Sequence, residues 1–242
     1  METQFRRREW KFLVGQAQAS ALEAELCRHM VKDPHGDPMG RYQVTSRYFD
    51  TPDLAIYRDR VLSPDTDGPT KLRMRVYGAH FYPEMPAMVE LKHTHQGVSH
   101  KQRLAITLAE AVDLLRGAGP PRRCDDQLLA ARVHRLVRTD RLVAVCDVAY
   151  TRTAFYAPEV GLRVTLDRQL VGRKLRTEPP VSSPLLAADA VVVELKAERR
   201  LPAWTSEILS GLYPLEQRFS KYVTAMGGIE GLDYELAEVT IS

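Results

Sequence analysis

Alternation of polar and apolar residues predicts an antiparallel sheet. The strictest case is Lys71–Tyr77, where charged and apolar residues alternate, and residues two apart on a strand point to the same face. Met88–His93 alternates similarly, and Gln96 with Gly97 provides a hairpin-type turn to a partner strand at Ser99–Ile106. The other predicted strands are Arg7–Val14, Tyr42–Phe49, Leu142–Tyr156, Leu162–Asp167, Gln169–Arg176 and Val191–Lys196.

Helices are predicted between and after these strands. Ser20 and Glu23 have the spacing of a capping box, whose side chains bond to free N–H groups at a helix start. Thr107 and Glu110 repeat it ahead of a helix that runs through Leu115. The remaining predicted helices begin at Asp125 or Asp126, and lie within Trp204–Leu209 and Phe219–Met226. No repeat or linker interrupts this succession of predicted strands and helices, so we expect one α+β domain over residues 1–242.

Most predicted strands have one ionic and one apolar face. Lys71, Arg73 and Arg75 share a face, opposite Leu72 and Met74. The same split places charges at Glu90 and Lys92, Lys101 and Arg103, Arg163 and Asp167, and Glu194 and Lys196. One such face is ordinary in a half-exposed sheet, but like charges repel across a ladder when most strands carry Lys or Arg. We therefore predict a closed antiparallel barrel, jacketed by helices, whose basic interior binds a chain of phosphates.

Three glutamates, Glu9, Glu90 and Glu194, each stand two positions before a lysine, so each carboxylate shares a strand face with an ammonium group. One interpretation is simple ion pairing. The other is that one or two of them hold Mg²⁺ or Mn²⁺, which bind phosphate-loaded sites through few carboxylates plus substrate oxygens. Glu194 is the strongest candidate for such a metal ligand.

Composition narrows the possible partners. A net charge of +3, from 34 basic and 31 acidic residues, is too mild for a general nucleic-acid coat, and the basic strands lack the interleaved aromatic residues of a stacking platform. Three cysteines without CxxC spacing favour reduced thiols in a cytoplasmic protein. No stretch approaches the ~20 apolar residues of a membrane helix. We expect neither nucleic-acid binding nor membrane insertion.

A set of short motifs, in this order along nearly the whole chain, resembles a known family. The motifs are Arg7-x-Glu9-x-Lys11, Ser46-Arg47-Tyr48-Phe49-Asp50, Lys71-x-Arg73-x-Arg75-x-Tyr77-Gly78, Val89-Glu90-Leu91-Lys92, His100-Lys101-x-Arg103, Tyr150-x-Arg152, Leu162-Arg163-Val164-Thr165-Leu166-Asp167, Glu194-Leu195-Lys196 and Phe219-Ser220-Lys221-Tyr222. Together they resemble the catalytic domain of vacuolar transporter chaperone (VTC) polyphosphate polymerases, within the triphosphate tunnel metalloenzyme superfamily. Arg7, where related enzymes often have an acid, favours the VTC branch.

The resemblance implies an eight-stranded tunnel and a role for each candidate. The residues expected to act on phosphates are Lys11, Arg73, Arg75, Lys92, Lys101, Arg152, Arg163, Lys196 and Lys221. Those expected to support substrate binding are Arg47, Lys71, Arg103, Tyr150, Arg218 and Ser220. Glu194, with Glu90 and Glu9 as further candidates, is expected to bind Mn²⁺ or Mg²⁺.

Three functions agree with this pattern. The family activity transfers the γ-phosphate of ATP to a polyphosphate chain and releases ADP, which makes a polyphosphate polymerase the first expectation. A tripolyphosphatase or nucleoside triphosphatase would use the same ligands, with Glu9 or Glu90 directing a water molecule. A non-catalytic sensor of polyphosphate or nucleotides would keep the cations and could dispense with Glu194. The sequence leaves the acceptor, the chain length and the oligomeric state open.

Overall fold

The computed structural model describes residues 8–63, 68–95, 98–198, 201–212, 215–216 and 219–227. Its strands are β1 (Arg8–Gly15), β2 (Val31–Lys32), β3 (Arg41–Asp50), β4 (Lys71–Tyr77), β5 (Pro86–His95), β6 (Val98–Thr107), β7 (Val143–Ala157), β8 (Leu162–Lys174), β9 (Val181–Pro184) and β10 (Ala190–Ala197). They form a ten-stranded antiparallel sheet in the order β1-β10-β8-β7-β3-β4-β5-β6, with β2 paired to β7 and β9 to β8. The predicted α+β class is confirmed.

The helices are α1 (Gln16–His29), α2 (Ala55–Leu62), α3 (Leu108–Leu115), α4 (Gln127–Thr139), α5 (Thr205–Leu212) and α6 (Lys221–Met226), with a 3₁₀ turn at Pro158–Val160. Two helix starts are as predicted. Thr107 and Glu110 form the capping box of α3, and Asp126 accepts a hydrogen bond from the N–H of Leu129 in α4. None of the described helices is long and apolar enough to cross a bilayer.

The first predicted capping box is wrong. Helix α1 begins directly after β1, and the Gln18 side chain accepts a hydrogen bond from the Gly15 N–H at 3.1 Å. Ser20 therefore lies inside the helix, and its hydroxyl accepts a bond from the Gln16 side chain. The prediction failed because glycine can occupy the cap position with no side-chain signal of its own.

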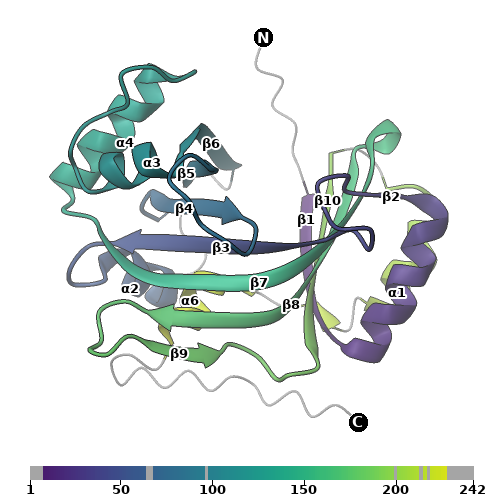
Figure 1. Cartoon of the computed structure of the whole chain (residues 1–242). Coiled ribbons are helices and arrows are strands. Elements are labelled where there is room, and N and C mark those ends of the chain that lie inside the picture. Colours follow the sequence, from purple (N-terminus) through teal and green to yellow (C-terminus); the bar gives the residue numbers. More distant parts are fainter. Residues whose placement is uncertain are drawn as a thin grey trace.

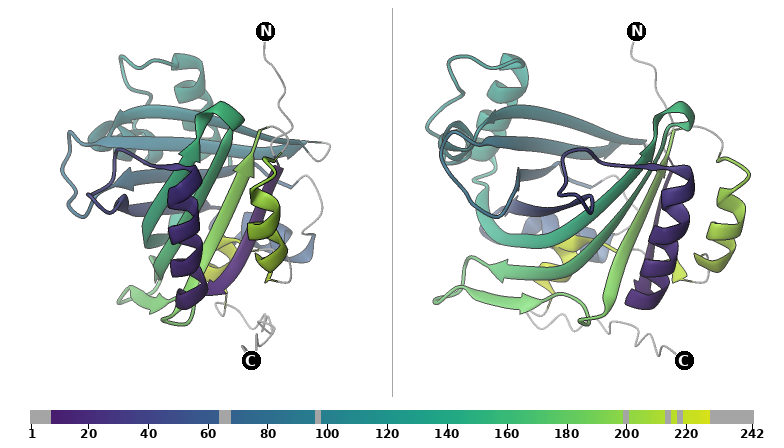
Figure 2. Two further views of the ribbon diagram at one scale, coloured as in Figure 1. Left: turned by 90° about the vertical axis from the view of Figure 1, so that its right-hand side faces the viewer. Right: turned by 45° about the vertical axis from the view of Figure 1, so that its right-hand side comes forward.

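The apolar face of the sheet is covered by helices, as predicted. At one end Phe12 and Val193 pack in a cluster with Leu22 of α1 and Leu209 of α5. At the other end the apolar side chains of β4, β5 and β6 pack in a cluster with those of α3 and α4. Figure 1 shows α1 beside β1 and β10 and the pair α3 and α4 beside β5 and β6, and Figure 2 shows the sheet curving between them. Register shifts at Tyr48/Phe49 and Ala149/Thr151 add local bends.

The predicted closure into an eight-stranded barrel is not seen among the described strands. Strands β1 and β6 stand at the two ends of the ladder, and within the described residues β1 pairs beyond β10 through an isolated bridge between Phe12 and Glu216. The sheet is thus strongly curled and open within the described residues. Alternation along a strand determines which side chains share a face, but it carries no information on whether two edge strands meet.

Helix α6 covers one end of the concave face, behind β7 and β8 in Figure 1. Its Tyr222 ring stacks on Tyr48 at 5.2 Å, and its hydroxyl donates to the fully buried Asp50. Asp50 also accepts hydrogen bonds from the N–H groups of Ile56 and Tyr57, both at 2.9 Å, at the start of α2. One carboxylate therefore joins β3, α2 and α6. The sequence predicted α6 but neither α2 nor this connection.

Candidate functional site

The strand register brings the charged side chains onto one face of the curled sheet. We call this the ionic face, and its members include Glu9, Lys11, Tyr42, Ser46, Tyr48, Lys71, Arg73, Arg75, Tyr77, Glu90, Lys92, Lys101, Arg103, Tyr150, Arg152, Arg163, Thr165, Asp167, Glu194 and Lys196. Antiparallel partners lie directly opposite one another, so these side chains form a continuous surface over eight strands. The sequence predicted most of this surface from strand parity.

The middle of the ionic face is a buried cluster around Asp167. Arg152 donates two hydrogen bonds to its carboxylate, at 2.6 and 2.8 Å, and Lys221 of α6 approaches it to 2.8 Å. Both cations lie over the Tyr150 ring, at 5.2 Å for Arg152 and 4.9 Å for Lys221. Burial would raise the pKa of Asp167, but the charges of Arg152 and Lys221 outweigh it and lower that pKa. The carboxylate is therefore ionised, and the cluster of two cations and one carboxylate carries a net positive charge.

A second cluster alternates charges between β1 and β10. Glu9 lies opposite Lys196, and Lys11 lies opposite Glu194. The Lys196 Nζ is 2.5 Å from one Glu194 oxygen and 3.9 Å from Glu9. Burial would raise the pKa of Glu194, but the interaction with Glu9 and the charges of the nearby lysines, Lys196 first among them, lower it well below the usual value. Two carboxylates thus meet within a cationic surface.

Glu90 sits in a third cluster and is surrounded by cations. Its carboxylate is 2.6 Å from Arg73, 2.5 Å from Lys101 and 2.8 Å from Arg103, and the residue is only 1% exposed. Its oxygens are already engaged by three cations from neighbouring strands. This arrangement distinguishes Glu90 from the pair Glu9 and Glu194.

The curl brings the two ends of the sheet close enough for their charges to interact. Lys92 on β5 has a lowered pKa, first through desolvation, although the residue keeps contact with solvent. Lys11 adds to this lowering, whereas Glu9 and Glu194 oppose it. Since these three residues belong to β1 and β10, the strands at opposite ends of the ladder face one another across the ionic face. We call this concave ionic face, whose curvature Figure 2 shows, the trough.

Two polar atoms on the floor of the trough are buried without a hydrogen-bond partner in the structure. They are the hydroxyl of Tyr150 and the Oγ1 of Thr165, which lies opposite Glu194. Buried hydroxyl groups are rarely left unpaired, because the desolvation cost is about 1–3 kcal/mol. Their position beside Arg152 and Glu194 indicates a surface built to receive additional polar atoms.

The remaining predicted residues are spread more widely. Arg163 lies at the open end of the trough and donates to Asp33 at 3.3 Å, and Ser220 caps α6. Arg47 lies on the opposite face of the sheet, where it makes two hydrogen bonds to Asp147 at 2.7 and 2.8 Å. Arg218 lies outside the described residues. Of the predicted cations that the structure describes, all but Arg47 lie on the ionic face or, like Lys221, beside it.

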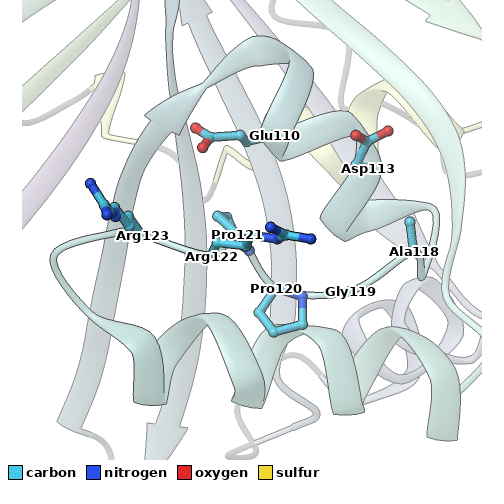
Figure 3. A pocket seen from close by; sticks show the side chains of 8 residues that line it. All are labelled: Glu110, Asp113, Ala118, Gly119, Pro120, Pro121, Arg122 and Arg123. Carbon is cyan, nitrogen blue, oxygen red and sulfur yellow. The ribbon is translucent and has the colours of Figure 1, made fainter.

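A shallow pocket of about 650 Å³ lies elsewhere, on the α3 side of the molecule. Figure 3 shows Glu110 and Asp113 on α3 facing the loop that carries Arg122 and Arg123. Its charges are of mixed sign, and its lining contains no candidate site residue. The pocket therefore does not coincide with the ionic face.

A comparison with known families decides the relationship. The profile of the VTC domain matches residues 6–228. The chain belongs to the VTC domain family. This confirms the family resemblance seen in the motifs. The matched range contains all the residues that the sequence predicted to bind phosphate or metal. No curated protein sequence gives a significant match.

Two solved structures share the fold of this VTC domain. A candidate adenylate cyclase from Bacillus halodurans is 16% identical with a TM-score of 0.53, over 88% of this chain and 92% of the other. The Hippeastrum protein HpAC1, described as an adenylyl cyclase candidate with a dominant triphosphatase activity, is also 16% identical, with a TM-score of 0.52 over 91% and 95% of the two chains. At this identity the likeness establishes the fold alone.

Sequence reasoning gave no role to three residues that the VTC domain places at its site. The sequence placed Asp167 on the same strand face as Arg163. Its buried contact with Lys221, however, joins segments far apart in the chain. Asp33 and Tyr42 contact Arg163 at the open end of the trough. Asp33 directly precedes Pro34, and nothing in the local pattern there indicates a distant cation.

Two lysines of the VTC domain should make anion binding depend on pH. Burial, and then the charge of Arg60, lower the pKa of Lys71 to about 8. Burial also lowers the pKa of Lys101 to about 8; the charge of Glu90 opposes this shift and that of Arg73 adds to it. At pH 9 each would be mostly neutral. At pH 9 both lysines must take up a proton when the anion binds, and this costs free energy. Tripolyphosphate affinity, measured by calorimetry, should therefore weaken by roughly 10- to 100-fold between pH 7 and 9.

The stability of the free protein should change in the opposite direction. Because the folded pKa of both lysines lies below the unfolded value of about 10.4, the unfolded chain binds more protons above pH 8, and stability rises with pH there. The variant Lys71→Arg with Lys101→Arg is the control, since arginine stays charged. It should keep its affinity up to pH 9. A wild-type affinity that does not change over this range would contradict the lysine assignment.

Proposed function

We propose that this VTC domain binds a triphosphate or polyphosphate chain along the trough and transfers the γ-phosphate of ATP to a polyphosphate acceptor, releasing ADP. The observation that carries the proposal is the continuous ionic face, in which cations outnumber carboxylates on the walls and floor. Such a surface is self-repelling without an anion, and arginine and lysine together match a row of phosphate groups. Membership of the VTC domain family supports the same conclusion.

The carboxylates fit a divalent cation through Glu194 and Glu9. Both carboxylates lie near the same ammonium group, the Nζ of Lys196, at 2.5 Å for Glu194 and 3.9 Å for Glu9, and the unpaired hydroxyl of Thr165 lies opposite Glu194. Mg²⁺ and Mn²⁺ bind nucleotides through one or two carboxylates plus phosphate oxygens. The described residues contain no group of three or more acidic, His or Cys ligands, which agrees with a cation that arrives with its substrate. When bound, it would neutralise charge on the phosphate oxygens.

The chain's own residues would position and neutralise the reacting groups. A loose phosphoryl-transfer transition state spreads charge over the oxygens of the transferred group, and Arg152, Lys221 and Arg75 would stabilise that charge. The acceptor's terminal phosphate is already an oxyanion at neutral pH, because its second pKa is about 6. Its oxygen forms the new bond to the γ-phosphorus, the β,γ-bridging P–O bond breaks, and ADP leaves. No strong general base is needed.

Hydrolysis of triphosphates is the second candidate. One observation favours it: HpAC1, which has the same fold, is described as having a dominant triphosphatase activity. A hydrolase must orient a water molecule, and the partly exposed Glu9 at the edge of the trough would be its carboxylate. The trough's cations serve either reaction equally.

One assay separates these functions. Purified protein is incubated with ATP and Mn²⁺ or Mg²⁺, with and without a short polyphosphate primer, and ADP, free phosphate and polyphosphate are quantified. Chain growth matched by ADP release is the expected result. Release of free phosphate without chain growth would select the hydrolase. If neither product forms although ATP binds, the domain is a binding module and the proposed catalysis is wrong.

A further inference from the structure

We propose that Tyr77, supported by Tyr42, is a stacking platform for the base of a nucleoside triphosphate at the open end of the trough. The proposal rests on the proposed function, because it requires the triphosphate to lie on the cations of the ionic face. It adds a specificity element that separates nucleotides from inorganic tripolyphosphate.

The platform continues the row of cations on β4. Tyr77 stands two residues after Arg75 and four after Arg73, so all three side chains share the ionic face. Two residues of strand span about 7 Å, a step comparable to one ribose unit between a base and its α-phosphate. A phosphate bound at Arg75 would therefore bring an attached base to Tyr77.

Contacts on neighbouring strands hold the Tyr77 ring in place. The Tyr42 ring meets it edge to face, with centroids 5.9 Å apart and an angle of 62°. The Tyr42 hydroxyl in turn accepts a hydrogen bond from Arg163 at 3.4 Å and donates to Asp33 at 3.5 Å. Tyr77 remains 37% exposed. A ring supported along its edge and open to solvent can stack on a base, a contact that tolerates any base because each has a π-face.

Two other rings of the ionic face, Tyr48 and Tyr150, are already covered. Tyr48, toward the opposite end, stacks on Tyr222 of α6. Tyr150 is 2% exposed and lies beneath Arg152 and Lys221. A nucleotide with its base at Tyr77 would therefore lay its phosphates along Arg75 and Arg73, toward the covered ring of Tyr48.

The test compares two ligands on one set of variants, without added metal. Dissociation constants for ATP and for inorganic tripolyphosphate are measured by calorimetry on the wild type, Tyr77→Ala, Tyr77→Phe and Tyr82→Ala. Tyr82 is the matched control, an exposed ring on the loop after β4. We expect Tyr77→Ala to weaken ATP binding by about 5- to 150-fold, the range of single base–aromatic stacks. Tripolyphosphate should change less than about twofold, and Tyr77→Phe and Tyr82→Ala should match the wild type.

A second comparison needs no variant and is therefore independent of folding. Ribose 5-triphosphate, which lacks the base, should bind the wild type more weakly than ATP by a factor similar to that seen with Tyr77→Ala. Equal loss of both ligands in Tyr77→Ala, or equal binding of ATP and ribose 5-triphosphate, would overturn the platform while the proposed function stands. If the wild type binds neither ATP nor tripolyphosphate, the proposed function itself fails.

Discussion

Glu194→Gln should reduce metal-dependent turnover of ATP by roughly 100-fold or more. Glutamine keeps the shape and one acceptor oxygen but removes the charge that a hard cation requires. A metal contributes several kcal/mol of charge stabilisation in such reactions, and each 1.4 kcal/mol is about tenfold in rate. Binding of tripolyphosphate without metal should persist, because the lysines and arginines of the trough are unchanged. Turnover and metal-free affinity are measured on the same preparation.

A purely structural role for Glu194 predicts a different result. If the carboxylate only paired with Lys196, the variant would lose thermal stability without ligand, and activity would fall only as the fold failed. We expect a small change in melting temperature, since Lys196 keeps Glu9 at 3.9 Å. The matched control is Glu23→Gln, a partly buried glutamate paired with Arg168 at 3.1 Å on the helix-covered side. It should retain full turnover. Near wild-type turnover of Glu194→Gln with metal present would refute the metal assignment.

The ionic face was predictable because strand periodicity is local. In β4 the charges at Lys71, Arg73 and Arg75 mark one face without ambiguity, and the structure places all three there. In β3 both faces carry polar residues, so parity alone could not say whether Ser46 or Arg47 faces the trough. The register gives that position to Ser46, whose hydroxyl accepts a hydrogen bond from Arg75 at 3.2 Å. Arg47 belongs to the other face.

Features that depend on distant segments could not be read from the chain. Three such features are the curl that brings β5 toward β1, the ladder that is open within the described residues, and the cover that α6 forms over one end of the concave face. All three arise from packing between segments far apart in sequence. Helix α2 is an example, because the N–H groups at its start donate to Asp50, the last residue of β3, and not to a side chain at its own cap position, Leu54. Two separately predicted strands proved to be the single strand β8, in which Gln169 adopts a left-handed backbone conformation (φ 53°) without ending the ladder.

Asp167→Asn should destabilise the free protein by roughly 3–5 kcal/mol, because it leaves the buried cations Arg152 and Lys221 without their counter-charge. For a chain of this size that loss corresponds to a fall in melting temperature of about 6–20 °C. Tripolyphosphate should restore most of the stability and bind more tightly than to the wild type, since its oxygens replace the missing carboxylate and no longer compete with it. Melting temperatures with and without tripolyphosphate measure both effects.

The control for this prediction is Asp147→Asn, which breaks a similar two-bond pair with Arg47 on the opposite face. Because Arg47 is 37% exposed, water can replace the lost charge, and the cost should stay below about 1 kcal/mol with no change in tripolyphosphate affinity. The two variants differ in which face of the sheet loses a negative charge. If Asp147→Asn tightened anion binding while Asp167→Asn left both affinity and stability unchanged, the anion would bind the other face, and the trough would be a structural core of ion pairs.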